Sequence, residues 1–207
     1  MTTLLQLNSS LFSNQGQSSQ LADAFVAAWR ARNKDGVVIV RDLAHDPVPH
    51  LTAERFQAFL AKPSERNVAQ QAVVSYSDTL IDEVNRADVI AIGLPMYNFG
   101  IPSPLKAYFD HIARAGITFG YTENGPVGLL SGKKAYVFAT RGGYYAGTAR
   151  DTQTGYVRDF LAFLGITDVE FFYAEGIAIS DAHKQTAIAK AKDAIGQLIF
   201  TPAAVAA

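Results

Sequence analysis

The sequence predicts an α/β fold: one doubly wound parallel sheet of five strands, with helices on both faces. Short apolar runs alternate along the chain with longer segments whose apolar residues recur at helical spacing. This alternation implies parallel βα units with right-handed crossovers, for which the simplest strand order is 2-1-3-4-5. The 207 residues, 49% hydrophobic and 18% charged, suit one globular domain with a substantial core.

Each expected strand is an apolar or β-branched run bounded by turn residues. The third opens the stretch Asp88–Lys106, which ends at Pro102 and Pro104, two residues that cannot continue a strand. In chain order, the strands are expected at Thr2–Asn8, Val37–Val40, Val89–Gly93, Ala135–Thr140 and Val169–Tyr173.

The helices follow from apolar residues three and four positions apart. The first is expected to begin near Ser18, and the fourth to stop at Gly165. The inner faces of the first four are expected at Leu21/Phe25/Ala28/Trp29, Leu80/Ile81/Val84, Leu105/Phe109/Ile112 and Phe160/Leu161/Leu164. The last helix is expected from Ala182 to about Phe200, with a frayed tail at Pro202–Ala207.

A single domain over residues 1–207 is predicted, with two excursions that the sheet does not need. His45–Arg66 holds three prolines around a helical run at Thr52–Ala61. Thr118–Ser131 contains an Asn124-Gly125 turn. Excursions of this length usually carry function or form interfaces.

The composition argues against several classes of protein. A net charge of -1 gives no basic excess for nucleic-acid binding, and no polybasic run favours an anionic membrane. No apolar stretch approaches ~20 residues and no signal peptide is expected, so the cytoplasm is the expected compartment. Without cysteine, and with four histidines not at metal-ligand spacing, no metal site is expected and redox chemistry would need a bound cofactor.

Ligands of such sheets bind beyond the carboxyl ends of the strands, where the strand order switches. The loop at residues 8–19 carries hydroxyls and amides, has no charge, and leads into a helix. Free amides and the helix dipole there favour a phosphate. The alternative is plain N-capping by Ser18. The loop matches neither the P-loop nor the G-x-G-x-x-G fingerprint.

Two further loops reach the same edge. Residues 94–100 combine two aromatic side chains, an amide and a glycine, which suits a flat, uncharged ring; the alternative is a buried aromatic turn. Residues 140–147 contain Gly142-Gly143, which allow close approach of the backbone to a ligand. Arg141 could stabilise a developing anion or could be simply solvated.

With these loops placed, the chain resembles the FMN-dependent NADH-azoreductase family of flavodoxin-like quinone reductases over nearly its whole length. The motifs that carry the resemblance are Ser9-Ser10 with Gln17-Ser18, PMYNF at 95–99, RAGITF and YTENGPVGLLSGKK within 114–134, TRGG at 140–143 and FLGITDVEF at 163–171.

The resemblance implies a homodimer with one FMN per subunit. It assigns Ser10, Gly16, Gln17 and Ser18 to the phosphate; Met96, Tyr97, Asn98 and Phe99 to the isoalloxazine; and Thr140, Arg141, Gly142 and Gly143 to its pyrimidine side. Many relatives have serine at position 16, so here only a backbone amide is left for the phosphate. Residues 45–66 and Tyr144-Tyr145 match the family least well, and these regions would shape substrate choice.

The family's chemistry implies ping-pong hydride transfer from NADH or NADPH to the flavin and then to a quinone or azo compound, with no obligatory catalytic side chain. We further expect Tyr121, Phe163, and Phe56 and Phe59 of the partner subunit to sandwich the substrate. The alternative is that Phe163 is core and Phe56 is dimer packing.

Two other classes share the predicted fold. A flavodoxin-type electron carrier would hold FMN without a substrate of its own, but it is usually strongly acidic and lacks long excursions. A receiver-type signalling module needs an acidic cluster after its first strand, where this chain has Asn8-Ser9-Ser10.

Overall fold

The computed structural model describes residues 2–200, without the side chains of residues 199 and 200. Its main sheet has five parallel strands in the order β2-β1-β3-β6-β7, which confirms the predicted order. The expected tail at Pro202–Ala207 lies outside the described residues. The strands are β1 (Thr3–Asn8), β2 (Val37–Asp42), β3 (Val89–Pro95), β6 (Lys134–Thr140) and β7 (Asp168–Ala174).

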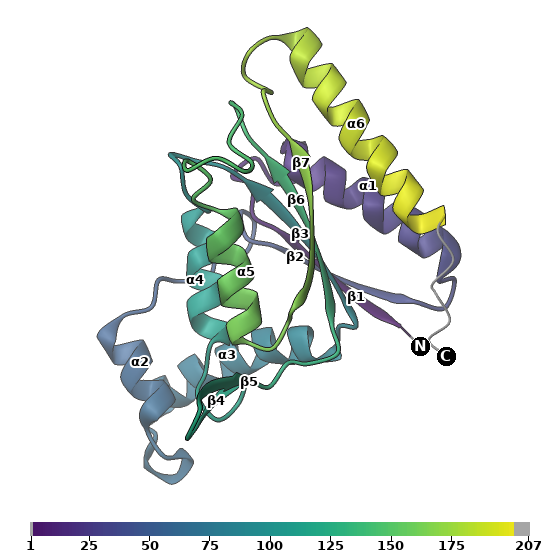
Figure 1. Ribbon diagram of the computed structural model, residues 1–207. Coiled ribbons are helices and arrows are strands. Elements are labelled where there is room, and N and C mark those ends of the chain that lie inside the picture. Colours follow the sequence, from purple (N-terminus) through teal and green to yellow (C-terminus); the bar gives the residue numbers. More distant parts are fainter. Residues whose placement is uncertain (1, 201–207) are drawn as a thin grey trace.

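Helices cover both faces of the sheet (Figure 1). One face carries α1 (Gln17–Arg32) and α6 (Asp181–Phe200), and the other carries α3 (Val68–Arg86), α4 (Ser103–Ile112) and α5 (Thr154–Phe163). Successive residues of a strand point to opposite faces. Leu4 therefore packs under α1, while Leu5 and Leu7 pack under α3 and α4.

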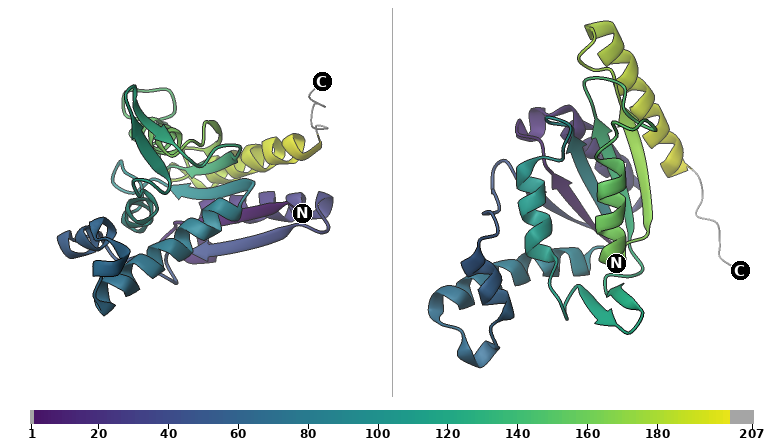
Figure 2. Two further views of the ribbon diagram at one scale, coloured as in Figure 1. Left: turned by 90° about the horizontal axis from the view of Figure 1, so that it is seen from below. Right: turned by 60° about the vertical axis from the view of Figure 1, so that its left-hand side comes forward.

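The two excursions form small elements of their own. The first contains α2 (Ala53–Leu60), which Thr52 caps, and η2 (Pro63–Glu65). The second is an antiparallel hairpin of β4 (Phe119–Thr122) and β5 (Gly125–Gly128). The expected helical run is present, and the turn lies at Glu123-Asn124, one residue before the expected Asn124-Gly125. Figures 1 and 2 show α2 projecting beyond the sheet below α4.

Glycine at position 93 brings α1 close to the sheet. A Cβ there would lie 3.2 Å from the backbone of Ser18, tighter than most real contacts. The first turn of α1 therefore lies directly on β3, beside the point where the strand order reverses between β1 and β3. The start of this helix is thus held at the carboxyl edge of the sheet, where ligands of such folds bind.

Candidate functional site

Three loops meet at the carboxyl edge of the sheet and are joined by hydrogen bonds. They follow β1, β3 and β6. The Ser9 hydroxyl donates to the carbonyl of Gly93 at 2.6 Å, and the Ser10 and Tyr97 hydroxyls lie 3.2 Å apart. The Met96 amide donates to the carbonyl of Thr140 at 2.9 Å. The predicted convergence of the three loops is therefore present.

The β1–α1 loop offers free donors at the start of α1. The amides of Gln17, Ser18 and Ser19 donate to no group among the described residues. The Ser18 hydroxyl is fully buried and also has no partner. Unpaired amides and the positive end of the helix dipole favour an anion. This set of donors fits a phosphate.

The structure changes the role of Gly16. Its amide already donates to the carbonyl of Ser13 at 3.2 Å, so it is not available to a phosphate. A Cβ at position 16 would lie 2.1 Å from Oγ and 2.4 Å from Cβ of Ser10. Any side chain at position 16 would therefore have to displace Ser10, which lies against the backbone there. The sequence could not show this contact, which joins two sides of the loop.

The β3–α4 loop is a tight turn from Tyr97 to Gly100. These two residues exchange backbone hydrogen bonds, at 3.2 and 3.0 Å. Between them, Asn98 and Phe99 have φ values of 50° and 62°. The left-handed region is costly for a residue as bulky as phenylalanine, and such strain often marks ligand sites.

The turn changes which amides can meet a ring. Thr140 and Gly100 accept from the amides of Met96 and Tyr97, which are therefore occupied. The amides of Asn98 and Phe99 donate to no described group, and both residues are exposed. Of the four residues that the resemblance assigns to the ring, Asn98 and Phe99 thus have backbone amides open to a ligand.

Gln153 braces this turn, and sequence reasoning did not identify it. Its side chain is fully buried, and Nε2 donates to the carbonyl of Pro95 at 3.0 Å and to that of Gly100 at 2.9 Å. These carbonyls lie on either side of the Met96–Phe99 segment. The neighbouring Thr152 hydroxyl also donates to the Phe99 carbonyl. A lone glutamine more than fifty residues away carries no signal of such a role in the sequence.

The side chain of Arg141 does not face the ligand edge, which corrects both interpretations offered from the sequence. It is fully buried, 2.8 Å from Asp151 and 3.2 Å from Glu175, and its guanidinium lies 5.0 Å from the ring centre of Tyr173. Burial alone would raise the pKa of Asp151, but hydrogen bonds from Arg141 and Thr154 hold it below its usual value. Arg141 is a structural ion-pair centre that anchors the loop.

The glycines after Arg141 do present backbone donors. The carbonyls of Gly142 and Gly143 accept from Ala178 and Gly176, which ties the loop to the segment after β7. Their amides donate to no described group. Next to them, the Tyr145 ring packs edge-on against Phe99, with the ring centres 5.7 Å apart. The amides of two loops therefore stay open.

The four expected substrate residues lie at the opposite edge of the same chain. Tyr121 belongs to the β4–β5 hairpin, which lies near the start of β6 (Figure 1). Phe163, the last residue of α5, packs on Phe119 of that hairpin at 4.3 Å between ring centres. β6 spans seven residues, so roughly 20 Å of sheet separates this edge from the three loops.

The aromatic residues of α2 also lie away from the loops. The Phe59 ring contacts His111, near the end of α4, and the Arg114 guanidinium lies 5.0 Å from its centre. Phe56 is half exposed, at 51%. Within one chain, Tyr121 and Phe163 therefore do not lie over the three loops, and the expectation that they sandwich a substrate there from their own chain is not met.

Within residues 2–200, no helix combines the length and the apolarity needed to cross a membrane. Over the same residues, no cluster of three or more His, Asp or Glu side chains has the arrangement of a metal site.

Comparison with known proteins agrees with this geometry. The family described as having a flavodoxin-like fold matches residues 2–199. The chain is 55% identical over 199 residues to an FMN-dependent NADH:quinone oxidoreductase of Cellvibrio japonicus, covering 96% of this chain and 99% of that protein. A protein of the same description from Alcanivorax borkumensis is 52% identical over 189 residues, covering 91% and 96%.

Solved structures give the same picture. An azoreductase from Bacillus anthracis strain Sterne has a TM-score of 0.87 at 26% identity, over 96% of this chain and 99% of its own. An FMN-dependent NADH-azoreductase from Bacillus anthracis strain Ames Ancestor, solved in complex with FMN, has a TM-score of 0.85 at 26% identity. The match covers 96% of this chain and 100% of that one.

Proposed function

Since the chain belongs to the family with the flavodoxin-like fold, we propose that it is an FMN-dependent oxidoreductase that uses NADH to reduce quinones. The observation that carries this proposal is the unpaired donor set at the start of α1, the amides of residues 17–19 with the buried Ser18 hydroxyl. A helix start with unsatisfied, uncharged donors suits a phosphate monoester.

The remaining loops fit the ring of the same cofactor. The open amides of Asn98 and Phe99 lie on one loop, and those of Gly142 and Gly143 on the other. Together they can donate to carbonyl oxygens and ring nitrogens along the polar edge of an isoalloxazine. Bound FMN would accept hydride from NADH and give it to the electrophile. The protein orients the two reactants and keeps the ring among uncharged groups.

No side chain of the three loops is needed as an acid or base. NADH plus a proton and a quinone become NAD⁺ and a hydroquinone, and the second proton of the hydroquinone arrives with the hydride. An aromatic azo compound needs two such rounds to give two amines. We include azo cleavage and the ping-pong order in the proposal, because the Bacillus anthracis relatives are described as azoreductases.

We extend the proposal to a homodimer in which each site is completed by the other chain. The support is the distance along one chain between the three loops and the aromatic residues Tyr121, Phe163, Phe56 and Phe59. An antiparallel pairing of two chains would bring this aromatic edge over the partner's loops. Flat substrates then lie between the ring and aromatic side chains, with water excluded.

Mixed dimers test this arrangement. One variant carries Gly16→Ala, which disturbs the phosphate loop, and the other carries Tyr121→Ala with Phe163→Ala. If the aromatic residues act across the interface, a mixed dimer regains one intact site and quinone reduction returns on mixing. If they act within their own chain, or not at all, mixing gives only the average of the two separate activities.

The alternative is a flavodoxin-type electron carrier with the same cofactor. The absorbance spectrum of purified protein loaded with FMN separates the two. The enzyme should lose its flavin bands on addition of NADH, recover them on addition of benzoquinone, and repeat this with catalytic turnover. A carrier would show no turnover of NADH with benzoquinone, which would overturn the proposed function.

A further inference from the structure

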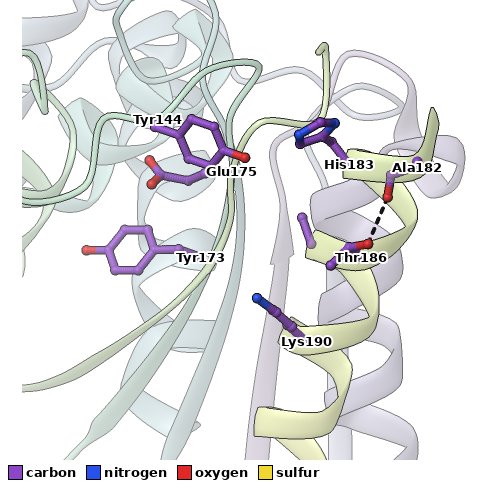
Figure 3. A pocket seen from close by; sticks show the side chains of 8 residues that line it. Tyr144, Tyr173, Glu175, Ala182, His183, Thr186 and Lys190 are labelled. Atoms are coloured by element: carbon purple, nitrogen blue, oxygen red, sulfur yellow. Dashed lines mark hydrogen bonds between the residues drawn. The ribbon is translucent and has the colours of Figure 1, made fainter. Parts of the chain in front are cut away.

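A cavity of about 450 Å³ lies on the far side of the β6–α5 loop from the β1–α1 and β3–α4 loops. It opens between the end of β7, the β6–α5 loop and the first turns of α6 (Figure 3). Its volume falls within the ~300–1,000 Å³ typical of small-molecule sites. The residues that line it include Tyr144, Tyr173, Glu175, His183 and Lys190.

Tyr144 gives the cavity a flat aromatic wall. Its side chain is 62% exposed, and its ring has no aromatic partner among the described residues. It lies over Gly176, where a Cβ would be 2.7 Å from the phenol oxygen. The glycine therefore permits this placement of the ring. Tyr144 follows Gly143 directly, so the wall begins one residue beyond the expected pyrimidine edge of the flavin.

Glu175 supplies an acceptor at the same end of the cavity. Its Oε1 accepts from Arg141 at 3.2 Å and from the amides of Tyr145 and Ala146 at 2.8 Å each. No described group donates to Oε2. Because the three donors hold the carboxylate in place, Oε2 can accept from a ligand amine. Arg141 also offsets the negative charge, so an anion nearby is not strongly repelled.

The α6 side of the cavity is basic. Lys190 makes no ion pair among the described residues, and Figure 3 shows its side chain reaching from α6 toward Tyr173. His183 lies seven residues earlier and therefore on the same face of the helix. Its Nδ1 lies 2.8 Å from the Ser180 hydroxyl, which leaves Nε2 free toward the cavity.

A flat wall, a fixed acceptor and a cationic flank together describe one class of ligand. We propose that this cavity binds the adenylate half of NADH: the adenine ring lies against Tyr144, its amino group donates to Glu175, and phosphate oxygens meet Lys190 and His183. The assignment rests on the proposed function, which makes NADH the electron donor. Once the nicotinamide is over the flavin, the second nucleotide must extend past the ring, and the cavity adjoins that edge.

Comparing NADH with reduced nicotinamide mononucleotide, which lacks the adenylate, tests the assignment kinetically. Tyr144→Ala should lower kcat/KM for NADH about tenfold at saturating quinone, because stacking of a base is lost. Lys190→Ala should lower it about fivefold. Neither change should alter kcat/KM for the mononucleotide. Lys192→Ala is the matched control, since Lys192 lies on the same helix but lines a different crevice with Gln17.

The assignment would be overturned if Tyr144→Ala and Lys190→Ala lowered kcat/KM equally for NADH and for the mononucleotide, or did not lower it for NADH. Calorimetry with ADP-ribose and the FMN-loaded protein gives a second readout that needs no turnover. Binding that weakens in Lys190→Ala and not in Lys192→Ala supports the site; absence of binding, or equal binding by both variants, argues against it. If neither donor is oxidised at all, the proposed function fails, and the calorimetry still decides whether the cavity takes an adenylate.

Discussion

Replacing Gln153 by methionine tests whether the flavin turn is held by a single buried amide. Methionine keeps the length of the side chain and removes both hydrogen bonds, at 3.0 and 2.9 Å, to the carbonyls of Pro95 and Gly100. Each buried hydrogen bond contributes about 1 kcal/mol net, so the loss is about 2 kcal/mol. Oε1 of Gln153 has no partner, and removing it recovers part of that cost. We expect a net loss of about 1 to 2 kcal/mol.

The apo protein should therefore unfold at lower urea concentration, with Tm lower by roughly 2 to 8 °C for a chain of this size. FMN affinity should fall about tenfold, because the flavin would have to order a turn containing two left-handed residues. Gln71→Met is the control: this glutamine is exposed, and its side chain donates one hydrogen bond, to the Ser75 hydroxyl. A stability unchanged within about 0.3 kcal/mol would refute the bracing argument, and a loss of stability with unchanged FMN affinity would limit Gln153 to a structural role.

Three further predictions use the same assays. Gly16→Ala should weaken FMN binding about tenfold, because the added Cβ would displace Ser10. Gly100→Ala should bind FMN normally, because a Cβ there would lie 3.7 Å from its nearest neighbour, the Tyr97 carbonyl oxygen. Equal FMN affinities of the two variants would contradict the packing argument. Asn98→Ala should lower the unfolding free energy of the apo protein by about 1 kcal/mol and Asn98→Gly should not, because φ is 50° there; identical urea curves would show that the turn relaxes freely. Burial lowers the pKa of His111. Below pH ~6.5 the unfolded chain therefore binds a proton at this residue more readily than the folded chain does. The free energy of unfolding should then decrease as the pH is lowered, by up to about 1.4 kcal/mol per pH unit. His111→Leu should flatten this slope between pH 7.5 and 5.5; an unchanged slope in His111→Leu would assign the effect to other groups.

The sheet order could be predicted because each strand carries its own signal. Apolar runs such as Val89–Gly93 and the helical spacing of Leu105, Phe109 and Ile112 depend only on neighbours in the chain. The convergence of the three loops followed from the topology, since carboxyl ends of parallel strands meet at one edge. Their chemistry, uncharged and rich in hydroxyls and amides, was likewise readable in the composition of each loop.

The role of Arg141 could not be predicted, because its partners come from other segments. An arginine beside two glycines resembles a ligand contact. Asp151 and Glu175 lie ten and thirty-four residues further on, and only folding brings them to within 2.8 and 3.2 Å of the guanidinium. Gln153 was missed for the same reason, since its side chain donates to the carbonyl groups of Pro95 and Gly100, which lie more than fifty residues away in the sequence.

The sequence by itself determined the fold class, the strand order and the edge at which a cofactor would bind, because hydrophobic periodicity and strand direction are local properties. Only the tertiary structure decided which donors are open at that edge. The amides of Gly16, Met96 and Tyr97 donate to backbone carbonyl groups of the protein. Those of Asn98, Phe99, Gly142 and Gly143 donate to no described group and stay open to a ligand. The tertiary structure also placed Tyr121 and Phe163 a sheet's length away. Hydrogen-bond partners and distances across a sheet depend on packing between remote segments, and no local pattern encodes them.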